Sequence, residues 1–246
     1  MTLNITFKYA IFPLGCIKHF QKYISIILDN FSHQEYYEPI GIILIRGNSN
    51  DVQQAGTIMM NSIDHIIGYH CAPAIRGIKL SNLVSIPRDM NEQIQFVLIE
   101  YNKAFNEKGL FFFELCRCKA RRLLLVFREK QLRDYVRQPA VMLFLKAYGY
   151  HDRMSIMEML EHLRYRMEVS IEFPHEIGIF LGYPLKDVKC FISYRGGGYR
   201  MCGEWKVYHD VVNAQRSFLC YKACREFCQT QLMLGKTFSS LVARTA

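Results

Sequence analysis

Two apolar runs, LFFFELCR at residues 110–117 and RRLLLVFR at residues 121–128, decide the fold of this 246-residue chain. Both runs are rich in aromatic and branched side chains, which favour β-strands. Only Cys118, Lys119 and Ala120 separate them. Because so short a connection joins neighbouring antiparallel strands, the two runs predict a β-hairpin.

Helical patterns lie on both sides of this hairpin along the sequence. Residues 91–106 predict a helix that ends before Gly109, with an apolar stripe formed by Ile94, Val97, Leu98, Tyr101 and Phe105. Residues 129–137 and a segment from Pro139 to near Gly149 predict two more helices, and Ser155 with Glu158 predicts a capping box for a third. A hairpin among many helices predicts an α+β domain, with a mixed or antiparallel sheet flanked by several helices.

The remaining elements are shorter. Residues 62–69 predict an apolar strand that ends at Cys71-Ala72-Pro73. Residues 174–181 and 184–192 predict two short helices hinged at Gly182, and residues 200–208 predict a strand after the glycine turn at 196–198. Asp210 begins a long terminal helix, whose expected buried face carries Val211, Ala214, Phe218, Tyr221, Cys224, Cys228 and Leu232.

The domain boundaries follow from these patterns. We expect one domain over residues 59–234, an N-terminal extension over 1–58 and a C-terminal tail over 235–246. The extension contains a possible helix at 20–31 and a possible strand at 41–46, and Met59 or Met60 could be the true start of the protein.

Composition describes a folded protein, since 50% of the residues are hydrophobic and 22% are charged. The formal charge of +9 is a weak hint at an anionic partner, and a basic surface without a specific ligand is the favoured explanation. No apolar run reaches the about 18 residues that a membrane-spanning helix needs. The nine cysteines cannot all pair within the chain, which favours reduced thiols and a cytoplasmic location.

Three separated motifs carry a family resemblance: HCAPAIRGIK at 70–79, FPHEIGIFLGYP at 173–184 and CGEWKVY at 202–208. They resemble the signatures of domain of unknown function 3793, an uncharacterised family found mostly in anaerobic Firmicutes. Its members typically read HCAPTLAGIK, FPHEIGxFLGYPLEDV and LCGYWKVYGD. The resemblance covers roughly residues 60–232, with departures at Ala74, Arg76 and Glu204. It implies no particular activity, cofactor or partner.

Cys71 is a candidate catalytic nucleophile, because a thiol at a turn can be exposed enough to react. His175 could act as its base, with Glu176 or Asp187 orienting the imidazole ring. A small buried cysteine beside a structural histidine explains the same residues. Our leading interpretation is a binding or regulatory module with one shared surface. That surface is formed by His70, Cys71, Lys79, His175, Glu176 and Trp205, and its candidate ligand is a small molecule or an anion. A thiol-dependent hydrolase or transferase is the alternative.

Nucleic-acid binding and metal binding are less favoured. The spacing within residues 175–192 is compatible with a helix-turn-helix that presents Lys186, Lys189 and Ser193, but a plain structural hairpin fits better. The spacings of Cys116, Cys118, Cys220, Cys224 and Cys228 do not resemble the paired cysteines of structural zinc sites, so we predict no metal site. Trp205 and Tyr208 would face opposite sides of the predicted strand, one in the core and the other available to line a pocket.

Overall fold

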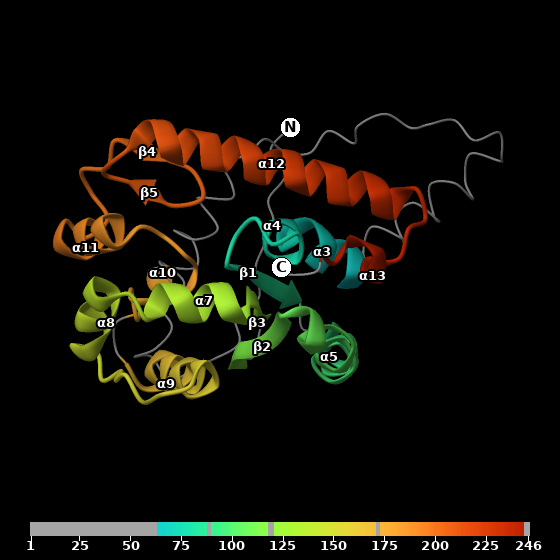
Figure 1. Cartoon of the computed structure of the whole chain (residues 1–246), viewed down its shortest axis with the longest axis horizontal. Coiled ribbons are helices and arrows are strands. Elements are labelled where there is room, and N and C mark those ends of the chain that lie inside the picture. Colours follow the sequence, from blue (N-terminus) through green and yellow to red (C-terminus); the bar gives the residue numbers. More distant parts are fainter. Residues whose placement is uncertain (1–62, 88–89, 118–120, 171–172, 244–246) are drawn as a thin grey trace, which may run out of the picture.

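The computed structural model describes residues 63–87, 90–117, 121–170 and 173–243 (Figure 1). The predicted extension at 1–58, with its possible helix and strand, lies outside these residues. The described part of the chain is an antiparallel sheet with helices on both faces, so the predicted α+β class is confirmed.

The central sheet has three antiparallel strands in the order β1-β3-β2. β2 (Leu110–Arg117) and β3 (Arg121–Arg128) form the predicted hairpin, whose register runs from Leu110 opposite Arg128 to Arg117 opposite Arg122. β1 (Ser81–Pro87), which the sequence analysis did not predict, pairs with the other edge of β3. β3 is therefore the middle strand, which explains why residues 123–127 are apolar without alternation.

The two faces of β3 contribute to two separate hydrophobic cores. Leu123, Leu125 and Phe127 point into one core, whereas Leu124 and Val126 point into the other. Successive side chains of a strand point to opposite faces, so one strand can anchor both layers of helices.

The first core is covered by helices that follow the hairpin. They are α7 (Glu129–Val136), α8 (Pro139–Lys146), α9 (Ile156–Val169), α10 (Ile177–Phe180) and α11 (Leu185–Ser193). The predicted capping box of α9 is confirmed: the Glu158 backbone N–H donates to Ser155 Oγ at 3.2 Å, and the Ser155 N–H donates to the Glu158 carboxylate at 2.7 Å.

The second core lies under helices from both ends of the described chain. They are α3 (Ile63–His70), α4 (Ala72–Ile75), α5 (Asn91–Phe96), the π-helix η2 (Val97–Tyr101), α6 (Asn102–Phe105), the 3-10 helix η3 (Asn106–Lys108), α12 (Val211–Met233) and α13 (Phe238–Leu241). The helix predicted at 91–106 is thus confirmed, with a π-helical stretch inside it, and Gly109 ends it in the left-handed conformation at φ 72°.

Two predictions of local structure were wrong. Residues 63–70 form α3 and not a strand, because Ile63 and Ile67 bury one side of a helix that packs against α12. Residues 200–208 form a small hairpin and not one strand: β4 (Met201–Cys202) pairs with β5 (Lys206–Val207), and the chain reverses between them.

Residues beyond α12 pack against the second core. Phe238 and Leu241, which the sequence analysis assigned to a tail, are buried in the second core. The Ala243 backbone N–H also donates to the Ile75 carbonyl at 3.1 Å, which fastens this segment to α4. Residues 237–243 therefore pack as part of the same domain.

The long helix α12 connects the two ends of the molecule (Figure 1). Its N-terminal half lies beside β4 and β5, and its C-terminal half lies beside α3 and α13. Its predicted face is confirmed, since Ala214, Cys224, Cys228 and Leu232 are buried. Among the helices of the described ranges, none has both the length and the apolar character that a membrane crossing requires.

Candidate functional site

The loop between α4 and β1 meets the segment after α10, although 100 residues separate them in the sequence. The Ser81 hydroxyl donates to the Phe180 carbonyl at 2.5 Å. Gly182 adopts φ +75°, and a Cβ atom there would lie 2.8 Å from the Leu80 side chain. A residue other than glycine would therefore be both strained and crowded, so Gly182 permits the close approach of the two segments.

Lys79 is the centre of this junction and is only 6% exposed. Its Nζ atom lies 5.4 Å from the ring centroid of Tyr183 and 5.5 Å from that of Tyr221. Tyr183 in turn stacks on Trp205 with ring centroids 5.3 Å apart, and Trp205 meets Phe218 edge-on at 4.6 Å. We name this cluster of Lys79, Tyr183, Trp205, Phe218 and Tyr221 the motif junction, because all three sequence motifs contribute to it.

A covered ion pair acts on the charge of the buried lysine. Arg225 Nη2 lies 2.6 Å from Glu204 Oε1, and both side chains are almost entirely covered. The pKa of Lys79 is lowered to about 8, chiefly by desolvation, which Glu204 opposes; the Arg225 charge also lowers the pKa, and Cys71 opposes the shift weakly. The same surroundings reach His70, whose pKa is lowered by desolvation and by Arg225 while Glu204 acts in the opposite direction. The structure thus brings His70, Lys79 and Trp205 into one neighbourhood, but Lys79 and Trp205 are buried and do not form an open surface.

Cys71 also lies inside the protein. Its side chain is fully buried in the second core, and burial raises the pKa of the thiol well above its ordinary value, with Lys79 the opposing charge. A nucleophilic cysteine requires the thiolate form and access to substrate. These surroundings match the interpretation of Cys71 as a small core residue and give no support to catalysis.

His175 and Glu176 belong to different surroundings from Cys71. The His175 ring packs near the rings of Phe173 and Phe191, at centroid distances of 6.2 and 5.2 Å. Glu176 is buried and forms an ion pair with Arg166 of α9 through Oε1. The geometry therefore does not assemble the proposed dyad of Cys71 and His175 with Glu176 as orienting residue.

Asp187 is a polar centre that the sequence analysis mentioned only as a possible partner of His175. It lies in the first turn of α11 and is 2% exposed. Its Oδ2 accepts a hydrogen bond from Trp205 Nε1 at 2.8 Å, and its Oδ1 accepts from the backbone N–H groups of Tyr208 and His209 at 3.1 and 3.0 Å. The helix N-terminus and these donors stabilise a carboxylate at this position.

The same carboxylate orients His209. Asp187 Oδ1 lies 3.2 Å from His209 Nδ1, so the N–H of the neutral ring is directed to Asp187 when Nδ1 carries the proton. The His209 side chain is 48% exposed. Its Nε2 atom is then the ring nitrogen that remains available for a ligand.

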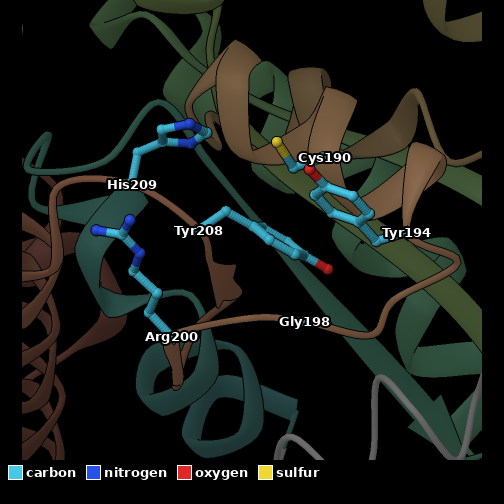
Figure 2. A pocket seen from close by; sticks show the side chains of 6 residues that line it. All are labelled: Cys190, Tyr194, Gly198, Arg200, Tyr208 and His209. Carbon is cyan, nitrogen blue, oxygen red and sulfur yellow. The ribbon is translucent and has the colours of Figure 1, made fainter.

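A hollow of about 250 Å³ lies between α11 and the β4–β5 hairpin, next to this histidine. It is lined by Cys190, Tyr194, Gly198, Arg200, Tyr208 and His209 (Figure 2). We name it the α11 hollow. Figure 2 shows Arg200 and His209 on one side of the Tyr208 ring, while the Tyr208 hydroxyl points toward Gly198.

Tyr208 contributes the least satisfied group of the α11 hollow. The residue is 5% exposed, and its buried hydroxyl has no hydrogen-bond partner within the described ranges. Burial raises the pKa of Tyr208 to about 12, and the charges of Cys190 and Asp187 act in the same direction. The hydroxyl therefore stays protonated near neutral pH and can donate a hydrogen bond. The prediction that one of Trp205 and Tyr208 lies in the core and the other lines a pocket is confirmed, since Trp205 belongs to a core cluster and Tyr208 lines the α11 hollow, although the two residues lie on a hairpin and not on one strand.

Arg200 brings positive charge to the α11 hollow. Its backbone is fixed by a 2.8 Å hydrogen bond from its N–H to the Val207 carbonyl. Its side chain is exposed and forms no ion pair with any residue of the described ranges. The sequence analysis missed Cys190, Tyr194, Arg200 and His209. A usable signal was the spacing of Asp187 and Cys190, which places both on one face of α11.

The geometry adds no support for metal binding or for nucleic-acid binding. Within the described ranges, no group of three or more histidine, cysteine, aspartate or glutamate side chains could hold a metal ion. Cys224 and Cys228 are buried in the second core, whereas Cys220 is exposed. α10 is a single turn of four residues, so the segment 175–192 lacks the first full helix of a helix-turn-helix.

Comparison with known proteins places the chain in a family. No curated protein and no solved structure matches it. The family model described as "Protein of unknown function (DUF3793)" matches residues 67–242, which include all three motifs and both the motif junction and the α11 hollow. The chain therefore belongs to the DUF3793 family, as the resemblance of its motifs predicted.

Proposed function

We propose that this protein is a binding module for a small anionic molecule, which it holds in the α11 hollow. The observation that carries the proposal is the buried Tyr208 hydroxyl, which has no hydrogen-bond partner among the described residues, beside a hollow that Tyr208, Arg200 and His209 line. A buried polar group without a partner costs about 1–3 kcal/mol, and a ligand that accepts its hydrogen bond recovers this free energy.

The arrangement favours a ligand with two polar ends. A carboxylate or phosphate fits the side of Arg200 and His209, since guanidinium groups form strong charge-assisted hydrogen bonds with such anions. A hydrogen-bond acceptor fits the opposite side, at the Tyr208 hydroxyl (Figure 2). The volume of about 250 Å³ suits a molecule of the size of a substituted benzoate and excludes a polymer bound in full.

Calorimetric titration with inorganic phosphate, benzoate and 4-hydroxybenzoate tests the proposal. We expect Arg200→Gln to weaken the binding of each anion by about tenfold, because a charge-assisted hydrogen bond is lost. We expect Tyr208→Phe to remove any preference for 4-hydroxybenzoate over benzoate and to leave phosphate binding unchanged.

The matched control is Arg216→Gln, which removes the same charge from an exposed residue of α12 that does not line the α11 hollow. Equal weakening by both arginine variants would mean that the anions follow the net charge of +9 and not the α11 hollow, and the proposal would be wrong. Unchanged affinity in Arg200→Gln would also contradict it.

We also propose a cytoplasmic location. Its support is the seven cysteines of the described ranges, which are all free of disulfide bonds, three of them at least partly accessible. Thiol quantification in protein from freshly lysed cells tests this location, and disulfide-bonded protein would contradict it.

A further inference from the structure

A thiol and an imidazole, those of Cys190 and His209, line the α11 hollow, and the buried carboxylate of Asp187 accepts a hydrogen bond from His209 behind it. We infer that Cys190, His209 and Asp187 catalyse acyl transfer from a small anionic ester or thioester to water. This inference rests on the proposed function, because Arg200 would hold the anionic end of the substrate.

Helix geometry brings Cys190 and Asp187 to the same place. They are three residues apart on α11, and such residues lie on one face of a helix. That face packs against β5 and the residues that follow it, where His209 lies. Figure 2 shows the Cys190 sulfur directed from α11 toward the side of the hollow on which the His209 ring lies.

The hydrogen bonds define the role of each group. Asp187 Oδ1 lies 3.2 Å from His209 Nδ1, and Asp187 Oδ2 accepts a hydrogen bond from Trp205 Nε1 at 2.8 Å. It is therefore a positioning residue, which leaves His209 Nε2 as the basic atom. Cys190 is partly exposed and lines the same hollow, in contrast to the fully buried Cys71. Thiol chemistry is thus inferred for Cys190 and His209, whereas the sequence suggested Cys71 and His175.

The reaction needs no group beyond the substrate and water. His209 Nε2 takes the proton of the Cys190 thiol, and the sulfur attacks the carbonyl carbon. A sulfur–carbon bond forms, the bond from that carbon to the leaving oxygen or sulfur breaks, and the imidazolium gives its proton to the leaving group. Water then attacks the thioester with His209 as base, which releases the carboxylic acid and restores the thiol.

Two aryl esters test the inference: 4-nitrophenyl hemisuccinate, which is anionic, and 4-nitrophenyl acetate, which is neutral. The release of 4-nitrophenolate gives the rate, and mass spectrometry of the intact and digested protein locates the acyl group. We expect the succinyl group on Cys190, with faster acylation by the anionic ester. His209→Gln should slow acylation by about 100-fold, the usual contribution of a general base.

Cys190→Ser should abolish the adduct, whereas Cys220→Ser should leave the rate unchanged, since Cys220 is exposed on α12 and outside the hollow. Circular dichroism of each variant shows whether it is folded. No succinyl group on Cys190, or an unchanged rate in His209→Gln, overturns the inference.

The failures of the two proposals are distinguishable. Phosphate binding that depends on Arg200, together with no acylation of Cys190 by either ester, leaves the binding module and removes the catalysis. Acylation of Cys190 at equal rates by both esters, together with no phosphate binding, removes the anion site and leaves the reactive thiol.

Discussion

The motif junction and the α11 hollow are linked by Asp187, which bonds Trp205 of the first and His209 of the second, yet their polar groups differ in surroundings. In the junction, Lys79 is enclosed by aromatic rings and the ion pair of Glu204 with Arg225 is covered. In the hollow, Arg200 is exposed and the Tyr208 hydroxyl has no partner within the described ranges. A covered ion pair and an enclosed lysine favour one arrangement of the chain, whereas an exposed guanidinium at the edge of a hollow is available to a ligand.

This contrast indicates that the sequence motifs mainly build the support for the candidate site. Their residues Lys79, Tyr183 and Trp205 lock three distant segments together. Asp187 connects the two regions. Its Oδ2 accepts a hydrogen bond from Trp205 in the motif junction, and its Oδ1 is hydrogen-bonded to His209 at the α11 hollow.

Trp205→Ala should have the largest effect on stability. It removes the stacking on Tyr183 and the edge contact with Phe218, and it takes one hydrogen bond from the buried Asp187. We expect a loss of about 4 kcal/mol in the free energy of unfolding, measured by urea denaturation. Tyr165→Ala, at a side chain that is 59% exposed, is the control and should change stability by no more than about 0.5 kcal/mol. A loss below about 1 kcal/mol for Trp205→Ala would show that the junction is not a stabilising core.

The pH dependence of stability should identify the buried lysine. The pKa of Lys79 is about 8 in the folded protein against an ordinary value of 10.5. Between these values the unfolded chain binds more protons than the folded one, so stability should rise as the pH increases from about 8 toward 10. The full difference corresponds to about 3 kcal/mol.

Lys79→Met is the matched variant, because it keeps an unbranched side chain and removes the titrating amine. Urea denaturation at pH 7.5 to 10 should show a smaller rise for this variant than for the wild-type protein. Parallel curves for the two proteins would mean that Lys79 keeps its ordinary pKa and is not enclosed as described.

Asp187→Asn should affect both regions moderately. In the wild-type protein, Trp205 and the His209 backbone donate to different oxygens of Asp187, and the asparagine side chain has only one acceptor oxygen. We therefore expect a loss of about 2 kcal/mol in the free energy of unfolding. His209 should also lose its orienting partner, which should weaken phosphate binding in the calorimetric titration. Asp134→Asn is the control, because it removes the same charge from an exposed pair with Lys130. If Asp187→Asn lowers stability and leaves anion binding unchanged, Asp187 supports the motif junction but not ligand binding in the α11 hollow.

Arg200→Gln should have the smallest effect on stability, within about 0.5 kcal/mol, because the side chain is exposed and its charge pairs with no described residue. Thermal unfolding without ligand measures this effect. A clear destabilisation would show that Arg200 supports the fold, and reduced anion affinity in this variant would then not report on ligand contact alone.

Local patterns predicted much of the fold. The short connection at 118–120 predicted the hairpin, and the pair Ser155 and Glu158 predicted the start of α9. Both depend on neighbouring residues, and so a single sequence contains the needed information. β1 was missed because its polar Ser81, Asn82 and Ser85 interrupt the apolar pattern, and its pairing partner lies about 40 residues away on β3.

The candidate site was predicted less well for the same reason. The motifs correctly indicated that distant segments meet, and a buried Cys71 was one of the interpretations, but they did not indicate that Lys79 would be buried. Arg200 and His209 carry no motif of their own, and their importance comes from the hollow that α11 and the β4–β5 hairpin enclose.

The sequence by itself determined the class of the fold, the hairpin, most helices and membership of the family, because each depends on periodicity or on short runs of residues. Only the tertiary structure decided which polar groups are buried with partners and which face a hollow. Burial depends on the packing of segments that are distant along the chain, and no local pattern specifies it.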